Sequence, residues 1–328
     1  MGAQAFIRLD SLWLHYCDKM PRSFKLRIIN PQLMEINMNK LNPPLQKVGI
    51  VLRPSSPELK GVFLQVCEEL NNAGIEVSLE SISGGMIELL GRDFSYIATQ
   101  CDALFSLGGD GTLISMLRRA FEYRLPCMGI NTGRLGFLTA IMPDSLKSFI
   151  PNLKSGDYTL QNHLVLQAKV YDTQTQQEAM HTFIAINEFL ISKHDLSGMV
   201  SIDAHIDGKH FNTYGCDGLI IGTPTGSTAY NISAGGSVIY PYCRNILLTP
   251  IAPHSLTQCP LVLNDEFVLE FRPKQRAKLI IDGQEMIDIM PFHKVQIQAL
   301  KQSAMLIYPR TRDYFNVLKE KFKWGDEY

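Results

Sequence analysis

Apolar positions recur with two different rhythms along this chain. Between residues 46 and about 140, short apolar runs alternate with stretches whose apolar residues lie at helical spacing. Val48–Leu52 has the pattern of a buried strand, and the stripe of an amphipathic helix follows it at Leu59, Val62, Phe63, Val66 and Leu70. Further strands are predicted at Ile75–Leu79, Ala103–Leu107 and Pro126–Ile130. This alternation predicts an α/β domain built on a parallel sheet with helices on its faces.

From about Gln161 the pattern changes to strand-like runs separated by turn residues, which predicts an all-β antiparallel domain. The runs are Leu164–Tyr171, Phe183–Ile191, Val200–Ile206, Leu261–Phe271, Leu279–Ile281 and Val295–Leu300. Near the end, Phe315, Leu318 and Phe322 lie at helical spacing. Because a short helix is poorly stable alone, we expect this one to pack back on the first domain.

These patterns predict three regions. Residues 1–44 mix hydrophobic and basic residues, end at Pro43-Pro44 and have no signal-peptide order. They are interpreted as an amphipathic or disordered extension, or as residues upstream of a true start at Met38, and the second interpretation is favoured. Residues 45–142 are the predicted α/β domain, completed by 309–328, and residues 143–308 are the predicted β domain.

Composition and charge narrow the classes of function. The 31 basic and 32 acidic residues give a formal net charge of -1, which does not favour a nucleic-acid or membrane-surface partner. The seven cysteines are scattered without a C-x-x-C pair, which indicates a reducing compartment and predicts a cytoplasmic protein. No apolar run reaches the ~18 residues of a membrane span.

A glycine-rich turn follows the strand at Ala103–Leu107. The sequence Gly108-Gly109-Asp110-Gly111 leads directly into a helical pattern. Glycines let a polyphosphate approach the backbone, and the start of a helix offers unpaired N–H groups. The alternative is a tight βα turn with an exposed aspartate.

Three other stretches are candidates for ligand contacts. Residues 217–236 carry six hydroxyl side chains around a Pro-Thr-Gly turn, with a helix predicted to be capped by Ser227 or Thr228. This composition suits a sugar and a base edge better than a metal, although a structural loop is the alternative. Phe137, in a loop after the fourth strand, is either a stacking residue or a core residue. Asn187-Glu188 interrupts an apolar run, so these residues either contact a ligand or face solvent.

The remaining turn signals and the missing motifs further restrict the possible structures and functions of the chain. Asp207-Gly208 and Asp282-Gly283-Gln284 are predicted to be hairpin turns. The chain has no G-x-x-x-x-G-K-[ST] motif, no strand-associated G-x-G-x-x-G with a following acid, and no protein-kinase signature.

Together these motifs resemble those of the NAD kinase family, from about Lys47 to Gly325. The glycine turn is shared with the wider superfamily of diacylglycerol, sphingosine and phosphofructokinase-like kinases. The stretches NTGRLGFLT, Asn187-Glu188, DGLIIGTPTGSTAYNISAGG and TPIAPHSL followed by PLVL are specific to NAD kinases. The resemblance implies a Rossmann-like, phosphofructokinase-like parallel sheet in the first domain, and an all-β second domain.

The resemblance also implies a reaction and a set of site residues. The γ-phosphoryl group of ATP, or of polyphosphate, would be transferred to the 2′-hydroxyl of the adenosine ribose of NAD, with Mg²⁺ or another divalent cation. Asp110 would accept the proton and would help to hold the metal. The donor phosphates would face Gly108, Gly109, Gly111 and Thr112. The dinucleotide would be bound by Asp110, Gly111, Phe137, Asn187, Glu188, Gly215, Asp217, Thr225, Thr228, Ala229, Tyr230, Asn231, Ile232, Ser233 and Gln284.

Three further expectations depend on this resemblance. Gly215 stands where some relatives carry arginine, and we expect NADH to be accepted as well as NAD. The β domain is expected to assemble homodimers or homotetramers, with Tyr230 near a site shared with a neighbouring subunit. The alternatives are a lipid or polyol kinase of the same superfamily and a non-catalytic NAD sensor.

Overall fold

The computed structural model describes residues 41–134, 136–139, 141–175, 178–195 and 197–325. Most of the predicted N-terminal extension, including Met38, lies outside these residues. The chain from Asn42 onward forms one compact unit, and the description below concerns that unit.

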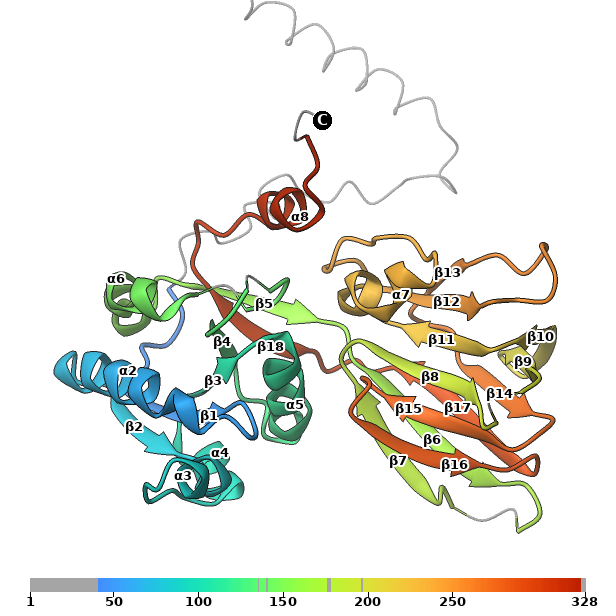
Figure 1. The fold of residues 1–328 in the computed structure, drawn as a ribbon, viewed down its shortest axis with the longest axis horizontal. Helices are drawn as coiled ribbons and strands as arrows, with labels where there is room; N and C mark the ends of the chain where they lie inside the picture. Colours follow the sequence, from blue (N-terminus) through green and yellow to red (C-terminus); the bar gives the residue numbers. More distant parts are fainter. Residues whose placement is uncertain (1–40, 135, 140, 176–177, 196, 326–328) are drawn as a thin grey trace, which may run out of the picture. The chain divides into compact units, whose positions relative to one another are not determined.

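The first sheet has six strands in the order β2-β1-β3-β4-β18-β5 (Figure 1). Its strands are β1 (Lys47–Leu52), β2 (Glu76–Leu79), β3 (Ala103–Gly108), β4 (Cys127–Asn131), β5 (Thr159–His163) and β18 (Ala304–Tyr308). All neighbouring pairs are parallel except β18 with β5. The predicted parallel sheet is therefore confirmed, with an antiparallel strand at one edge.

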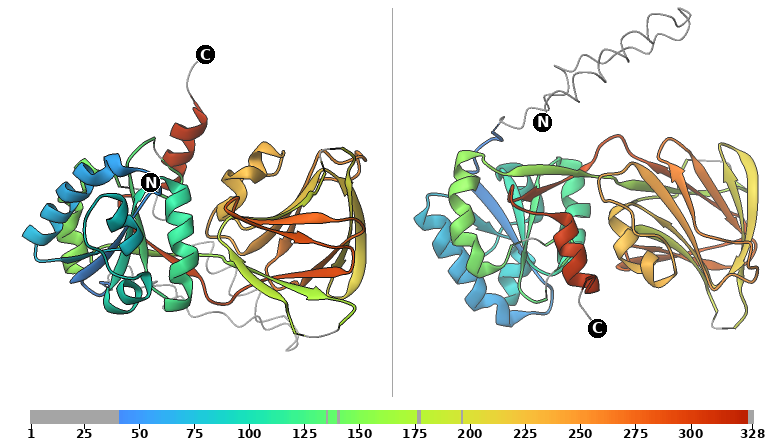
Figure 2. Two further views of the ribbon diagram at one scale, coloured as in Figure 1. Left: turned by 60° about the horizontal axis from the view of Figure 1, so that its bottom comes forward. Right: turned by 90° about the horizontal axis from the view of Figure 1, so that it is seen from above.

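Helices cover both faces of this sheet, as Figure 2 shows. On one face, α2 (Lys60–Asn72) and α6 (Pro143–Ser155) bury apolar side chains such as Phe63 and Phe149 against β1, β3 and β4. On the other face, α4 (Phe94–Gln100) and α5 (Asp110–Ala120) form a second buried cluster with Leu104 and Leu113. Shorter helices are α3 (Ser81–Met86), η3 (Pro57–Leu59) and η4 (Phe121–Tyr123).

The first sheet extends beyond the boundaries expected from the sequence. The helix α6 and the strands β5 and β18 belong to it, although residues 143–308 were assigned to the β domain. A buried apolar run such as Ala304–Tyr308 has the same pattern in a parallel sheet as in a β sandwich, so the change of sheet leaves no signal in the residue pattern.

The remaining strands form two antiparallel sheets that share one core. One sheet has the strand order β10-β9-β14-β17-β6-β7. Its strands are β10 (Lys209–Cys216), β9 (Val200–Ile206), β14 (Leu269–Pro273), β17 (His293–Ala299), β6 (Leu166–Asp172) and β7 (His181–Ala185). The other sheet has the strand order β13-β12-β11-β8-β15-β16. Its strands are β13 (Leu261–Asn264), β12 (Asn245–Ile251), β11 (Gly218–Gly222), β8 (Glu188–Lys193), β15 (Ala277–Ile281) and β16 (Glu285–Ile289). The predicted all-β antiparallel region is confirmed.

Two runs that were predicted as single strands are each divided between the two sheets. The run Phe183–Ile191 becomes β7 and β8, and Leu261–Phe271 becomes β13 and β14. The first division matters for function, because the chain changes sheets at Ile186-Asn187 and places Glu188 at the start of β8.

The predicted turns and helices are mostly confirmed. Asp207-Gly208 and Asp282-Gly283 are hairpin turns in which both residues have positive φ, at 49° and 77° and at 48° and 65°. The capped helix predicted near Ser227 is wrong: η5 (Thr225–Thr228) and the four-residue α7 (Tyr230–Ser233) lack a side-chain cap. The Ser227 hydroxyl instead donates to the Pro224 carbonyl at 2.6 Å and accepts from the Ile239 N–H at 3.0 Å.

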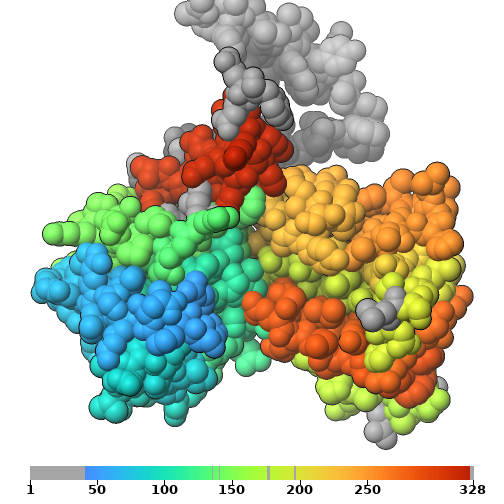
Figure 3. Space-filling model, in the orientation of Figure 1, coloured from blue at the N-terminus to red at the C-terminus, as the bar shows by residue number. Residues whose placement is uncertain are grey.

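The predicted C-terminal helix is α8 (Tyr314–Phe322), whose first turn is capped by the Asp313 carboxylate. It returns to the first part of the chain, because the Phe322 ring lies 5.6 Å from the ring of Phe137. α8 lies on the surface (Figure 3), where Phe315 remains 61% exposed. Among the helices of the described residues, none has both the length and the apolar character needed to cross a membrane.

Candidate functional site

The glycine turn joins β3 to α5 and leaves an open backbone surface. Gly109 is the N-cap of α5, and Asp110 is its first residue. A side chain at Gly108 would collide with the Thr112 hydroxyl, 2.4 Å from the position of a Cβ atom. A Cβ atom at Gly109 would meet nothing within 4 Å, and one at Gly111 would meet only the Gln284 amide at 3.9 Å. The N–H groups of Thr112 and Leu113 already donate to the Gly109 carbonyl, so the N–H groups of Asp110 and Gly111 are the ones that the helix start offers to an anion.

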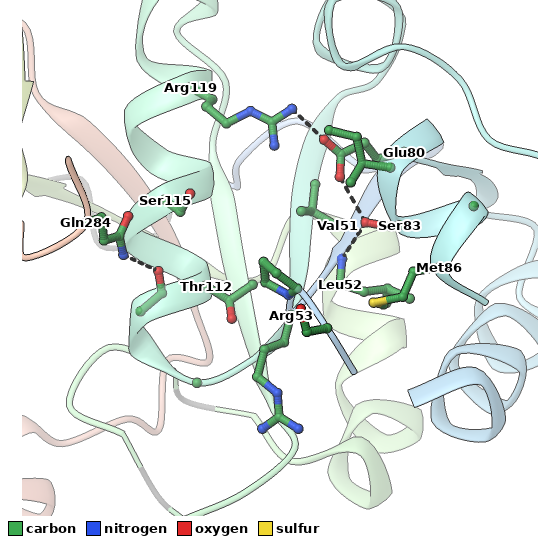
Figure 4. A pocket seen from close by; sticks show the side chains of 16 residues that line it. Val51, Leu52, Arg53, Glu80, Ser83, Met86, Thr112, Ser115, Arg119 and Gln284 are labelled. Atoms are coloured by element: carbon green, nitrogen blue, oxygen red, sulfur yellow. Dashed lines mark hydrogen bonds and ion pairs between the residues drawn. The ribbon is translucent and has the colours of Figure 1, made fainter. Parts of the chain in front are cut away.

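That space is a pocket of about 1020 Å³ (Figure 4). The end of β1 and the segment around α3 form one wall, and the first turns of α5 form the other. Of the four residues expected to face the donor phosphates, Gly109, Gly111 and Thr112 line this pocket, whereas Gly108 is buried at the end of β3 and is not among the lining residues. Gln284 joins them from the turn between β15 and β16.

Two arginines in this pocket are held in fixed positions by polar partners. Arg53 donates to the Ser56 hydroxyl and to the Glu58 carboxylate, both at 2.7 Å. Arg119 forms an ion pair with the buried carboxylate of Glu80 and lies over the Phe94 ring at 3.8 Å. Sequence reasoning missed both arginines, because neither belongs to a recognisable motif and the fold alone brings them to the pocket.

The Asp110 carboxylate is held by the loop that follows β4. Oδ2 accepts from the Phe137 N–H at 2.6 Å. Oδ1 accepts from the N–H groups of Leu138 at 3.2 Å and Thr139 at 2.9 Å, and from the Thr139 hydroxyl at 2.9 Å. Oδ1 therefore accepts three of the four bonds, whereas Oδ2 accepts one and keeps an acceptor position, because each carboxylate oxygen has about two.

The loop can approach Asp110 this closely because of its own residues. A Cβ atom at Gly136 would lie 2.0 Å from Asp110 Oδ1. The buried Asn131 side chain donates to the Thr139 hydroxyl at 3.0 Å and accepts from the Gly133 N–H at 2.8 Å, which shapes the loop. Sequence reasoning selected only Phe137 here, although the polar residues Asn131 and Thr139 within the same motif were available as a signal.

The Asp282-Gly283-Gln284 turn does more than reverse the chain. The Asp282 carboxylate accepts from the N–H groups of Ile186 at 3.0 Å, Asn187 at 2.7 Å and Glu188 at 3.0 Å. Gln284 donates to the Gly111 carbonyl at 2.8 Å. The turn therefore connects the Asn187-Glu188 crossing to the first turn of α5.

Arg118 strengthens this connection from the last turn of α5. Its guanidinium lies 3.6 Å from the Asp282 carboxylate and 2.7 Å from the Glu285 carboxylate. Sequence reasoning missed Arg118 and the role of Asp282, because an Asp-Gly pair signals a hairpin turn whatever its side chain contacts.

Glu188 is a buried acid. Its side chain is 6% exposed, and its Oε2 atom has no hydrogen-bond partner among the described residues. Burial, assisted by the nearby charge of Asp282, raises the pKa of Glu188 to about 8. Glu188 is therefore mostly protonated at neutral pH and can donate a hydrogen bond.

The polar stretch after β11 contains both buried and accessible groups. Thr225 is buried, and its hydroxyl lies 2.9 Å from Nδ1 of the buried His163. Burial lowers the pKa of His163 to about 3, so its ring is neutral, and Arg312 acts in the same direction. Thr225 and Thr228 line a small pocket together with Phe137 and Arg312. Ala229 and Ile232 are partly exposed, and Tyr230 and Ser233 are exposed.

Asn231, which was expected to contact the dinucleotide, has its side chain engaged within the protein. It donates to the carbonyls of Ser227 at 3.2 Å and Ser237 at 3.1 Å, and it accepts from the Thr249 hydroxyl at 2.6 Å. The hydrogen bond from Thr249 connects this stretch to β12. These contacts support a structural role for the Asn231 side chain.

Gly215 and Asp217 lie away from the other expected site residues of the same chain. Asp217 immediately precedes β11, whereas Thr223 immediately follows it. Six residue steps of extended strand separate them, a span of about 20 Å. Asp217 forms an ion pair with Lys193 at 2.9 Å.

Comparisons with known proteins agree on one family. Residues 48–158 match the family model described as the ATP-NAD kinase N-terminal domain, and residues 186–308 match the ATP-NAD kinase C-terminal domain. The NAD kinase of Helicobacter hepaticus is 77% identical over 301 residues, which cover 89% of this chain and 100% of that protein. The NAD kinase of Wolinella succinogenes is 48% identical over 284 residues, which cover 86% and 97%.

Two solved structures share the fold. The yeast NADH kinase complexed with NADH superposes with a TM-score of 0.79 at 22% identity, covering 87% of this chain and 90% of that one. The NAD kinase from Archaeoglobus fulgidus in complex with ATP gives a TM-score of 0.68 at 24% identity, covering 84% and 98%.

Proposed function

We propose that this chain, which belongs to the NAD kinase family, transfers the γ-phosphoryl group of ATP to the 2′-hydroxyl of the adenosine ribose of NAD. The observation that carries the proposal is the position of Asp110. This carboxylate stands between the open glycine turn, which suits donor phosphates, and the loop of Phe137, which suits a base.

The donor would lie in the pocket beside α5. Its phosphates would meet the exposed backbone of Gly109 and Gly111 and the first N–H groups of the helix. Arg53 supplies a positive charge to the same pocket and is fixed by Ser56 and Glu58. Phosphoryl transfer depends mainly on such positioning and charge neutralisation.

A magnesium ion fits this arrangement as a partner of the nucleotide. Among the described residues, no group of three or more histidine, cysteine, aspartate or glutamate side chains could hold a metal. Mg²⁺ commonly uses one or two carboxylates together with substrate phosphates, and Asp110 is the carboxylate at the glycine turn. When bound, the ion would neutralise charge on the donor phosphates.

The acceptor would lie on the other side of Asp110. Phe137 would stack against the adenine, and Thr225 and Thr228 line the same small pocket as Phe137. Asn187 and the protonated Glu188 would supply hydrogen bonds. The Asp110 carboxylate would then accept the proton of the 2′-hydroxyl, a contribution of roughly 10²- to 10⁴-fold to the rate.

Gly215 and Asp217 fit this site if a second copy of the chain supplies them. Within one chain they lie at the opposite end of β11 from Thr223 and Thr225. A homodimer or homotetramer formed through the β sheets would bring Asp217 of one subunit to the acceptor site of another, near the exposed Tyr230. The free thiols of all six described cysteines support our proposal that the enzyme works in the cytoplasm.

The direct test is the formation of NADP from NAD, ATP and Mg²⁺, detected with an NADP-specific dehydrogenase. We expect turnover of NAD and none of diacylglycerol. NAD binding without turnover would instead indicate a sensor, and turnover of diacylglycerol alone would indicate a lipid kinase. The same assay with NADH as acceptor, or polyphosphate as donor, tests the two finer expectations.

A further inference from the structure

Arg312 lies in the segment between β18 and α8 and contacts the loop that holds Asp110. Its Nη2 atom donates a hydrogen bond to the Phe137 carbonyl. Its guanidinium carbon lies 3.7 Å from the centroid of the Tyr308 ring. The aromatic face fixes the plane of the guanidinium, so the hydrogen bond has a defined direction.

The Phe137 carbonyl belongs to the same peptide group as the Leu138 N–H. Arg312 therefore holds one side of this peptide, and Asp110 Oδ1 accepts from the other side at 3.2 Å. A charged donor on the carbonyl polarises the amide and strengthens the hydrogen bond that its N–H donates. The Leu138 bond is the longest of the four that Asp110 accepts, so it depends most on such support.

We propose that Arg312 is a positioning residue for phosphoryl transfer. By holding the Phe137–Leu138 peptide, it keeps the Leu138 N–H directed at Asp110 and thereby keeps the Asp110 carboxylate in the orientation that accepts the 2′-hydroxyl proton. The proposal rests on the function proposed above and adds a residue from the C-terminal segment to its machinery.

A direct contact with the dinucleotide is the competing role, because Arg312 lines the same small pocket as Phe137 and Thr225. The observed contacts favour positioning, because one Nη atom is engaged by the Phe137 carbonyl and the guanidinium lies against the Tyr308 ring. A residue that binds NAD would change mainly its KM, whereas a residue that orients Asp110 would change mainly kcat.

The test compares steady-state NADP formation by the full-length wild type with that of Arg312→Ala, Arg312→Lys and Arg310→Ala. Arg310 is the matched control, because it lies two residues earlier and pairs with Asp157. We expect Arg312→Ala to lower kcat about 10- to 100-fold, the size of effect that a small misplacement of a reacting group produces. The KM values for NAD and ATP should change by less than about 3-fold.

Two further readouts keep the test decisive. Added guanidinium ion at low millimolar concentration should restore part of the kcat of Arg312→Ala, and Arg312→Lys should be intermediate. If Arg312→Ala lacks a cooperative thermal transition, the Arg312→Lys variant carries the kcat and KM comparison alone. An unchanged kcat, or a raised KM for NAD with kcat retained, would overturn the proposal. An inactive wild type would instead refute the proposed function itself.

Discussion

At the scale of single residues, two carboxylates organise the site by accepting backbone N–H groups. Asp110 accepts three of them from the Phe137 loop, and Asp282 accepts three from the start of β8. Both aspartates precede a glycine in the sequence, and the residue pattern predicts a turn at each position without indicating which N–H groups the carboxylate accepts. The partners are far away along the chain, so only the folded structure reveals them.

Glu188 makes stability depend on pH. Its pKa is raised to about 8 in the folded protein, so between pH 4.5 and 8 the folded state holds a proton that the unfolded state releases. Stability therefore falls as the pH rises through this range, by about 1.4 kcal/mol per pH unit where the difference is one proton. We expect urea unfolding of Glu188→Gln to show a decline from pH 6.5 to 8 that is about 2 kcal/mol smaller than in the wild type. Equal declines in the two proteins would contradict the assignment of a buried, protonated Glu188.

At the scale of elements, the positions of most strands and helices could be predicted from apolar periodicity. The strand β3, the helix α5 and the helix α8 lie within one to a few residues of their predicted positions. What periodicity could not show is which sheet a strand joins. The strands β7 and β8 look like one run because both are apolar, yet they belong to different sheets. The site depends on that crossing, which directs three N–H groups at Asp282.

The Asp282 side chain should contribute more to the stability of the protein than the Asp207 side chain, which begins an otherwise similar hairpin turn. Asp282 and Asp207 both begin Asp-Gly turns, with φ of 48° and 49°, so replacement by alanine causes similar backbone strain at both positions. Among the described residues, the Asp207 carboxylate accepts one N–H bond, from Val268, whereas the Asp282 carboxylate accepts three. We expect Asp282→Ala to lose at least about 2 kcal/mol more stability than Asp207→Ala, because buried N–H groups lose their partner. Chemical denaturation of both variants measures this difference, and equal losses would refute the role of the Asp282 side chain.

At the scale of the whole molecule, the site combines segments that are distant in the sequence. The glycine turn, the Phe137 loop and the Asp282 turn meet through Asp110, Gln284 and Arg118. The sequence motifs predicted most members of this group, because each motif is dense in glycine and small polar residues. The motifs could not distinguish residues that bind a ligand from residues such as Asn231, whose side chain forms hydrogen bonds within the protein, since the two kinds of residue have the same side-chain chemistry.

Assembly can be tested by complementation between inactive subunits. If Asp217 of one subunit serves the site of another, then Asp110→Asn and Asp217→Ala subunits mixed by refolding should form some intact sites. In such a pair, one site combines the wild-type Asp110 of one subunit with the wild-type Asp217 of the other. We expect NADP formation to rise well above that of either variant alone. Activity that never exceeds the sum of the two separate variants would show that Asp217 does not act across subunits.

The central claim is that Asp110 accepts the proton of the ribose 2′-hydroxyl. Its most direct test is kcat for NADP formation by Asp110→Asn, measured beside the wild type, with the NAD affinity and thermal transition of both proteins as controls. Loss of a positioned base predicts a fall in kcat of roughly 10²- to 10⁴-fold while NAD still binds. An Asp110→Asn enzyme that turns over NAD at the wild-type rate would contradict the account.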